Sequence, residues 1–238
     1  MACAANIYNR EEPQKRYAAK RIMAEELTEL EFYGDSLLLY DSVLIELVSR
    51  LNIIRKSSLL HNERDPIENV KTRIKSPKSM MNKLRMKGLE PVAENIKGNV
   101  TDAAGMRVIC TYIDDVYRVA SILAAQKDIN VLEIKDYIKN PKPSGYRSYH
   151  MIVELPIYIG DIQHTICAEI QLRTLSMDFW ASLEHQLRYK HDIPSHKMIE
   201  AELRRCADEV ASVEMNFITI RDMINSMKEN GEENDTKK

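Results

Sequence analysis

Apolar residues recur every three or four positions in the two terminal thirds of the chain, whereas in the middle they alternate with polar residues or form short runs. The first spacing predicts helices and the second predicts strands. Residues 13–62 are therefore expected to form one long helix or two in series, and residues 174–228 to be helical again. The last ten residues are polar, and we expect residues 229–238 to be disordered.

The middle of the chain predicts a sheet with few helices. Asp65, Pro66 and Glu68 have the spacing of a helix N-terminus, so a helix is expected to begin there, and a second one to run from Ser79 to Lys87. The other expected elements are a strand at Gly105–Ile113, a helix at Asp114–Gln126 and strands at Asn130–Ile138, Ser148–Pro156 and His164–Leu172.

This order of elements predicts an α+β fold, in which a mixed sheet of about five strands is flanked by helices and carries helical extensions at both ends. We expect four parts along the chain. They are an N-terminal helical extension at residues 1–62, a core at 63–192, a C-terminal helix at 193–228 and a disordered tail at 229–238.

Composition and charge exclude several classes of protein. The 34 Lys and Arg residues nearly balance the 36 Asp and Glu residues, which argues against a protein that coats nucleic acid. The four cysteines form no C-x-x-C pair, so neither a disulfide framework nor a zinc knuckle is expected. No apolar run approaches the roughly 20 residues of a membrane span, and the first residues lack the pattern of a signal peptide. We therefore expect a cytoplasmic protein that does not bind membranes.

The basic residues are nevertheless concentrated in one stretch, because no acidic residue occurs between Glu68 and Glu90. Ser79, Lys83 and Lys87 share one face of the helix expected there. Cations held in fixed positions suit a polyphosphate, although a solvated helix face is an alternative. The basic residues of the stretch include Arg73, Lys75, Lys78, Lys83, Arg85 and Lys87.

Two late strands place polar residues of several chemical kinds on one face. The alternation puts His150 on the polar side of one strand, and Glu169, Gln171 and Arg173 on the polar side of the next. An imidazole, a carboxylate, an amide and a guanidinium together indicate a binding site. The alternative is an ordinary solvated face of an antiparallel sheet.

Two further residues suggest nucleotide chemistry. Asp102 precedes the first strand of the core, close to Gly105, and there it could ligate Mg²⁺ or simply form a turn. Together with Glu169 it would supply two carboxylates to one cleft, which can hold a metal and activate a hydroxyl. Tyr146 follows Gly145 in a loop, where it could stack on a nucleobase or pack in the core.

Taken together, these stretches resemble the synthetase domain of the RelA/SpoT family, most closely the stand-alone small alarmone synthetases of the RelQ type. The resemblance covers roughly residues 35–225. The motifs that carry it are Arg73-Ile74-Lys75 with Ser79 and Lys83, Asp102–Arg107 (DAAGMR), Lys135–Ile138 (KDYI), Lys142–His150 (KPSGYRSYH), Glu169–Thr174 (EIQLRT) and Phe179–His185 (FWASLEH).

The resemblance implies a GTP pyrophosphokinase, which transfers the β,γ-pyrophosphate of ATP to the 3′-hydroxyl of GTP or GDP and releases AMP. The product, (p)ppGpp, is the alarmone of the stringent response. Asp102 would ligate Mg²⁺, and Glu169 would assist it or accept the proton of the attacking hydroxyl. The residues implied to bind ATP are Arg73, Lys75, Ser79, Lys83 and Arg107, with Arg85 or Lys87. Those implied to bind the guanosine nucleotide are Lys135, Lys142, Tyr146 (by stacking on guanine), His150, Gln171 and Arg173.

The resemblance also implies a ring-like homotetramer, held together by the terminal helices, and regulation by the alarmone or by RNA. One position departs from the bifunctional long enzymes of the family, which carry Arg two residues before the counterpart of Lys135, where this chain has Glu133. The preference among GTP, GDP and GMP therefore stays open. His191-Asp192 is similar to a hydrolase motif of the family, and we interpret that as chance.

Two other functions remain as alternatives. The first is a toxic small synthetase that modifies adenosine nucleotides or the acceptor end of tRNA. The second is an RNA-binding regulator that uses the same basic cleft without turnover. The pair of carboxylates argues against the second, because a protein that only binds a polyanion gains nothing from acids in its cleft.

Overall fold

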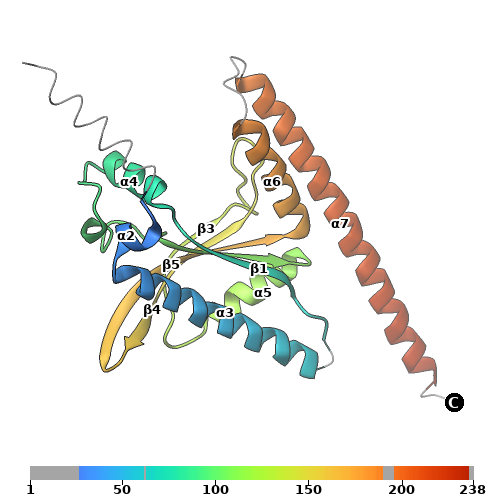
Figure 1. Cartoon of the computed structure of the whole chain (residues 1–238). Coiled ribbons are helices and arrows are strands. Elements are labelled where there is room, and N and C mark those ends of the chain that lie inside the picture. Colours follow the sequence, from blue (N-terminus) through green and yellow to red (C-terminus); the bar gives the residue numbers. More distant parts are fainter. Residues whose placement is uncertain (1–26, 62, 190–195, 236–238) are drawn as a thin grey trace, which may run out of the picture.

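A mixed sheet of five strands, in the order β1-β2-β5-β4-β3, forms the centre of the molecule (Figure 1). This computed structural model describes residues 27–61, 63–189 and 196–235. Strands β2 and β5 pair in parallel, and the other neighbours pair antiparallel. The strands are β1 (Ile67–Ile74), β2 (Ala104–Cys110), β3 (Asn130–Asp136), β4 (Tyr149–Ile159) and β5 (Ile162–Thr174). The α+β class expected from the sequence is confirmed.

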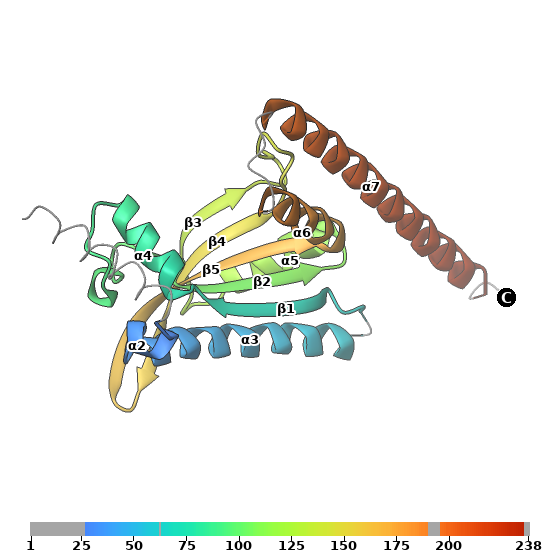
Figure 2. The same ribbon diagram turned by 45° about the horizontal axis from the view of Figure 1, so that its top comes forward.

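Helices cover the two faces of the sheet unequally. Helices α3 (Ser36–Leu60) and α5 (Ile113–Ala124) pack along one face, whereas α6 (Leu175–Tyr189) lies at one end of the other (Figure 2). Helix α7 (His196–Asp235) packs on α6 and continues past it (Figure 1). Three short elements, α2 (Glu29–Tyr33), α4 (Pro77–Met86) and the 3₁₀ turn η1 (Ala93–Asn95), pack together beside the sheet.

The main core lies between the sheet and the helices α3 and α5. Every second residue of the inner strands points into it, as the alternation predicts, and Met106, Met151 and Ile170 are buried there. Leu47 and Leu51 of α3 are completely covered on the opposite side of this core. Burying one face of the sheet in this way leaves the polar side chains of the same strands on the other face.

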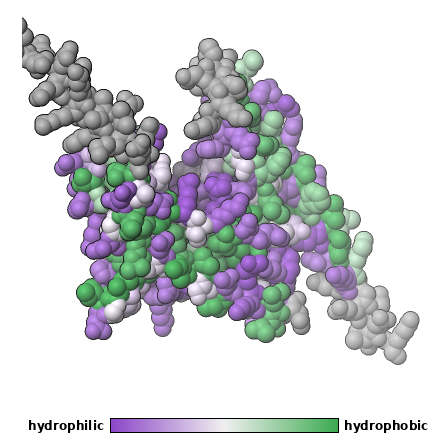
Figure 3. All heavy atoms as spheres, in the orientation of Figure 1, coloured by the Kyte–Doolittle hydropathy of each residue, from purple (hydrophilic) through white to green (hydrophobic). Residues whose placement is uncertain are grey.

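The polar face lies open between α4 and α6. Hydrophilic side chains fill the space between these two helices in Figure 3. A small second core, which contains Met80, Leu84 and Ala103, holds α4 at the edge of this space. The arrangement gives the open face a basic helix on one side and the start of α6 on the other.

The prediction that a helix begins at Asp65 is wrong, because the segment that follows Asp65 is strand β1. The carboxylate of Asp65 does accept a hydrogen bond from a backbone amide, as that of a capping residue would. The donor, however, is the amide of Ile67, the first residue of the strand (2.9 Å). A local capping pattern cannot distinguish the two, since Asp also closes turns of this kind. Pairing of β1 with β2 decides the outcome.

Other expectations differ in their limits. Helix α7 extends to Asp235, so residues 229–235, which were expected to be disordered, are helical. Three parts of the sequence analysis lie outside the described residues. They are residues 1–26, with part of the predicted N-terminal helix; the dipeptide His191-Asp192; and residues 236–238 of the predicted tail. None of the described helices is both long enough and apolar enough to span a membrane.

Candidate active site

The strand register sets the polar residues in two rows across the open face. Because residues opposite each other on paired strands share a face, each row runs across all five strands. The first row is Arg73, Gly105, Glu169, Ile152 and Glu133. The second row is Lys71, Arg107, Gln171, His150 and Lys135. The rows bring residues predicted for the two nucleotides onto one surface, with β5 in the middle.

Five side chains of this surface form a closed ring of hydrogen bonds. From Arg173, Nη2 donates to the Tyr146 hydroxyl (2.7 Å), which lies 2.9 Å from His150 Nε2, and His150 Nδ1 is 3.1 Å from Glu169 Oε1. In the other direction Arg173 Nη2 donates to Gln171 Oε1 (3.2 Å), and Gln171 Nε2 donates to Glu169 Oε2 (2.9 Å). Both paths therefore lead from the guanidinium to the carboxylate of Glu169.

The ring also assigns the protons of His150. An ionised carboxylate only accepts hydrogen bonds, so Nδ1 of the imidazole donates to Glu169. When the imidazole is neutral, its other nitrogen, Nε2, accepts a hydrogen bond from the Tyr146 hydroxyl. Glu169 is thus held by an imidazole and an amide, whereas Asp102 is held by lysines.

These donors determine the charge state of Glu169. Burial is the largest influence and raises the pKa of the carboxyl, but hydrogen bonds from His150 and Gln171 outweigh it, so the pKa lies below its ordinary value. The negative charge of Asp102 acts weakly in the opposite direction, which places the two carboxylates in one electrostatic neighbourhood. At neutral pH Glu169 is therefore an ionised, partly buried base.

Asp102 has a different environment, at the mouth of β2. Its Oδ2 lies 2.6 Å from Lys75 Nζ, and its Oδ1 lies 2.7 Å from Lys83 Nζ. Burial raises the pKa of Asp102, but the bonds and charges of the two lysines bring it below the usual value. The sequence placed Lys83 on the basic face of α4, and the structure shows that this face is turned toward a carboxylate.

Two hollows open on either side of Glu169. The first, of about 270 Å³, is lined by Glu169 and Gln171 and by three cations of β1 and β2, namely Lys71, Arg73 and Arg107. The side chain of Arg73 lies across Gly105, where an added Cβ would be 3.6 Å from Arg73 Cγ, an ordinary van der Waals contact. This hollow offers positive charge from several directions, as a polyphosphate requires.

The second hollow, of about 200 Å³, has aromatic and basic walls. It is lined by Glu133, Lys135, Tyr137, Lys142, His150, Ile152 and Glu169. The ring of Tyr146 adjoins it, with Lys142 Nζ 4.9 Å from the ring centre and an edge contact to Tyr137. On its other side Tyr146 packs against Trp180 and Ala207. Packing in a small core, which the sequence left as an alternative, thus accounts for one side of this ring.

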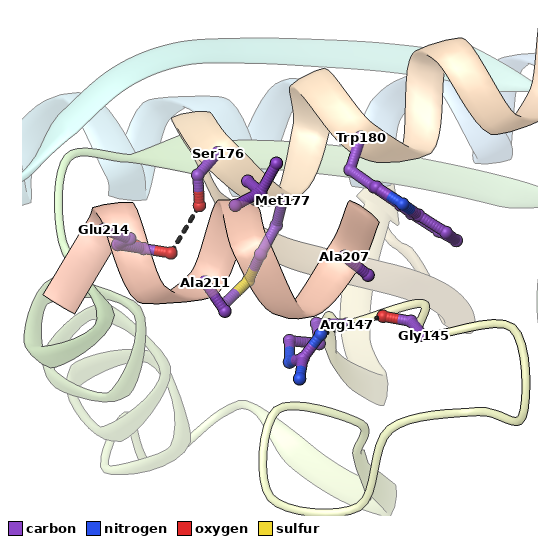
Figure 4. Close-up of a pocket in the computed structure, with 9 residues that line it drawn as sticks. Gly145, Arg147, Ser176, Met177, Trp180, Ala207, Ala211 and Glu214 are labelled. Carbon is purple, nitrogen blue, oxygen red and sulfur yellow. Dashed lines mark hydrogen bonds between the residues drawn. The ribbon is translucent and has the colours of Figure 1, made fainter. Parts of the chain in front are cut away.

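Helix α7 supports the loop that carries Tyr146. Gly145 has φ +90°, and a Cβ at this position would lie 2.5 Å from the Cβ of Ala207, so glycine allows the loop to touch the helix. Arg147 Nη2 donates to Asp208 of α7 (2.8 Å). Figure 4 shows Gly145 and Arg147 facing Ala207 across a small pocket that is closed by Trp180 and Met177 of α6.

Some predicted residues lie away from these carboxylates. Arg85 donates to Asn82 on α4 itself, and the side chain of Lys87 is exposed at the end of that helix. Ser79 accepts a hydrogen bond from Ser76 at the start of α4 (3.0 Å). Lys135, by contrast, lines the second hollow together with Glu169, although its ammonium pairs with Glu133 of its own strand (3.0 Å).

Three residues of the site were missed by the sequence reasoning. Lys71 lines the first hollow, Tyr137 lines the second, and Asp178 of α6 contacts Arg107 and Arg173. Lys71 alternates with Arg73, and this signal would have been visible had the segment been interpreted as a strand. Asp178 has no such signal, since contact between α6 and the sheet depends on the tertiary fold.

A metal at this site would need ligands from outside the protein as well. Among residues 27–61, 63–189 and 196–235, no three His, Cys, Asp or Glu side chains converge as a metal site would require. Mg²⁺ is usually bound by one or two carboxylates together with substrate phosphates and water. Asp102 and Glu169, beside a cationic hollow, fit that mode.

Comparisons with known proteins agree with this geometry. The family model described as "Region found in RelA / SpoT proteins" matches residues 72–194. The chain is 41% identical to GTP pyrophosphokinase YwaC of Bacillus subtilis over 183 residues, which is 76% of this chain and 86% of the relative.

Solved structures give the same result. Small alarmone synthetase 2 from Bacillus subtilis superposes with a TM-score of 0.71 at 38% identity, over 80% of this chain and 99% of that one. Small alarmone synthetase 1 of the same organism, bound to its product pppGpp, gives a TM-score of 0.70 at 34% identity, over 78% of this chain and 94% of that one. The segment that the family model matches contains both carboxylates and, apart from Lys71, all the residues that line the two hollows. The chain belongs to the RelA/SpoT family.

Proposed function

We propose that the protein is a GTP pyrophosphokinase, which transfers the β,γ-pyrophosphate of ATP to the 3′-hydroxyl of GTP or GDP and so makes (p)ppGpp and AMP. The observation that carries the proposal is the position of Glu169, which lines both hollows. A base between a cationic hollow and an aromatic one can meet a phosphate chain on one side and a nucleoside hydroxyl on the other. The names of the relatives support the same activity.

ATP would bind on the side of β1, β2 and α4. Arg73 and Arg107 in the first hollow, with Lys75 and Lys83 beside Asp102, would hold the triphosphate. Pyrophosphoryl transfer needs in-line positioning and charge neutralisation more than covalent chemistry. Fixed cations supply both at little cost of reorganisation.

The guanosine nucleotide would bind in the second hollow. A base stacked on Tyr146 would replace the ammonium of Lys142, which is exposed, whereas Arg173 under the same ring is buried and would stay. The freed Lys142 and Lys135 would then contact the phosphates of the acceptor. The ring of hydrogen bonds through Gln171 and His150 would keep Glu169 aimed at the 3′-hydroxyl.

In the reaction, the 3′-oxygen forms a bond to the β-phosphorus of ATP while the bond from that phosphorus to the α,β-bridging oxygen breaks. The bridging oxygen leaves with AMP, and the proton of the 3′-hydroxyl passes to Glu169. Oriented binding of both nucleotides can contribute about 7–11 kcal/mol to such a step. When bound, Mg²⁺ supplies neutralisation of phosphate charge, and Asp102 with Glu169 would be its protein ligands.

We also propose that copies of the chain assemble through α7. The predicted homotetramer would bury apolar side chains that α7 leaves exposed, among them Val213, Phe217 and Ile220. Val213 and Phe217 line an open hollow together with Leu175 and Phe179 of α6, and hydrophobic patches reach the surface along α7 in Figure 3. Regulation by the alarmone or by RNA stays a prediction, as does a cytoplasmic location.

The test is incubation of the full chain with labelled ATP, Mg²⁺ and, separately, GMP, GDP, GTP, ATP or tRNA. We expect label at the 3′-position of a guanosine nucleotide, release of AMP, and formation of labelled product at least about 10²-fold slower with Glu169→Gln. Label on an adenosine nucleotide or on tRNA would identify the toxic type of synthetase instead. No labelled product, together with salt-sensitive RNA binding, would favour the RNA-binding regulator.

A further inference from the structure

Asp178 contacts the site from outside the sheet. It lies in the first turn of α6, and its Oδ1 is 3.3 Å from Arg107 Nη1 and 3.1 Å from Arg173 Nη1. One carboxylate oxygen therefore contacts two guanidinium groups from different strands. Only 17% of the Asp178 side chain is exposed, so the contacts are sheltered from water.

The two arginines belong to different halves of the site. Arg107 of β2 lines the first hollow, where ATP would bind. Arg173 of β5 donates to Tyr146 and Gln171, which lie on the acceptor side and lead to Glu169. Asp178 is thus the common contact of a donor-side cation and an acceptor-side cation.

The charges explain why such a contact is needed. Burial lowers the pKa of Arg107, and the neighbouring charge of Arg173 lowers it further, whereas Asp178 raises it. Without the carboxylate the two guanidinium groups would face each other across adjacent strands and repel. With it, both are drawn to one point and keep a fixed relative orientation.

The carboxylate itself is rigidly placed. The hydroxyl of Thr174, the last residue of β5, accepts a hydrogen bond from the backbone amide of Met177 (3.3 Å), which fixes the start of α6 directly after the strand. Asp178 follows within the same turn. Its position is therefore tied to β5, the strand that carries Glu169.

We infer that Asp178 is a positioning residue that sets the register between the two nucleotides through Arg107 and Arg173 without touching either nucleotide. The inference rests on the proposed function for the meaning of the two hollows. It differs from an acid that merely favours a helix N-terminus, because such an acid would leave the binding of both nucleotides unchanged.

The test compares Asp178→Asn with Asp114→Asn. Asp114 is a matched control, since it too lies in the first turn of a helix and pairs with an arginine of another element, Arg221 (2.9 Å). Steady-state kinetics with ATP and GDP varied in turn would give kcat and both KM values. Thermal unfolding would measure stability.

For Asp178→Asn we expect kcat to fall by about tenfold or more, because misplaced reactants lose much of the advantage of orientation. Both KM values should rise, each by about threefold or more, since both arginines lose their anchor. Lys83→Ala should raise the KM of ATP alone, and Lys142→Ala that of GDP alone. Asp114→Asn should stay within about twofold of the wild type, as expected for an exposed ion pair.

A rise in one KM only, or kinetics like those of Asp114→Asn, would overturn the inference. A loss of activity that merely follows a loss of folded protein would do the same. If the wild type makes no 3′-pyrophosphorylated product, the proposed function fails. The inference about Asp178 is then tested by calorimetric measurement of nucleotide binding. Weaker binding of both GDP and a non-hydrolysable ATP analogue by Asp178→Asn would still support it, and unchanged binding, or no binding to the wild type, would refute it.

Discussion

Asp102 and Glu169 are two carboxylates on the same open face, but they are held in opposite ways. Asp102 is bound by two cations, Lys75 and Lys83, whereas Glu169 accepts hydrogen bonds from His150 and Gln171. In both, burial raises the pKa and the partners lower it below the ordinary value. The pKa of both carboxyl groups is therefore lowered, but mainly by lysines at Asp102 and by hydrogen bonds from His150 and Gln171 at Glu169.

The difference indicates different tasks. Lysines can exchange a carboxylate for a phosphate, so the surroundings of Asp102 are suited to change when ATP and Mg²⁺ arrive. Hydrogen bonds from an imidazole and an amide fix the orientation of Glu169 at the boundary of the two hollows, where an acceptor hydroxyl could reach it. We therefore expect Asp102 to act through the metal and the donor nucleotide, and Glu169 to act as the base.

Glu169→Gln should have the largest effect of any single change. The amide keeps the size of the side chain but cannot accept the proton, so kcat should fall by about 10²–10⁴-fold while both KM values change little. Steady-state kinetics would measure this. Glu154→Gln is the control, because Glu154 lies on the same face of the neighbouring strand and bonds Asn130. Turnover near that of the wild type would remove Glu169 from the role of base.

Asp102→Asn should come second. Loss of the ligand charge should lower kcat by about 10²-fold, as for removal of one well-placed charge stabiliser. It should also shift activation by Mg²⁺ to higher concentration, whereas Glu169→Gln should shift it less. A Mg²⁺ titration of the rate would measure both, with Asp128→Asn, which breaks a surface pair with Arg50, as the control. An unchanged Mg²⁺ dependence would contradict the assignment of Asp102.

The pH dependence of kcat/KM distinguishes whether Glu169 or Asp102 is the carboxyl group whose titration limits activity at low pH. The pKa of Glu169 lies below its ordinary value, so activity that needs its ionised form is retained as pH falls until that lowered pKa is reached. Replacing His150 by Phe removes one of the donors, which raises the pKa of Glu169, and the acid limb of kcat/KM should move to higher pH. If Lys83→Met moves the limb and His150→Phe does not, the titrating group is Asp102.

Gly145→Ala should have the smallest effect on turnover, and it tests how far the acceptor side depends on α7. A positive φ costs a non-glycine residue about 1–2 kcal/mol, and Gly160→Ala, at φ +59° with nothing within 4 Å, should lose only that amount. Gly145→Ala should lose more stability because of Ala207, and should raise the KM of the guanosine nucleotide. Equal loss in both variants, measured by denaturant unfolding, would mean that the loop does not depend on α7.

The part of the site that lies on strands with regular alternation of polar and apolar residues could be predicted from the sequence. Glu169, Gln171 and Arg173 share a face because side chains on a strand alternate, and His150 joins them because β4 pairs with β5 in the register that sets His150 opposite Gln171. Asp65 shows the limit of local patterns, since the same capping residue serves a helix or, as here, a strand. The same error explains why Lys71 was missed. Only when the segment is assigned as a strand does alternation place Lys71 on the same face as Arg73.

The sequence by itself determined the class of fold, the polar face of the late strands and the motifs of the RelA/SpoT family, because these depend on residues close together along the chain. The tertiary structure decided that β5 lies in the middle of the sheet, parallel to β2, and so set the strand that follows Asp102 beside the strand of Glu169. It also brought Asp178 to Arg107, 71 residues away. Pairing between distant segments is chosen by the packing of the whole core, which no local spacing encodes.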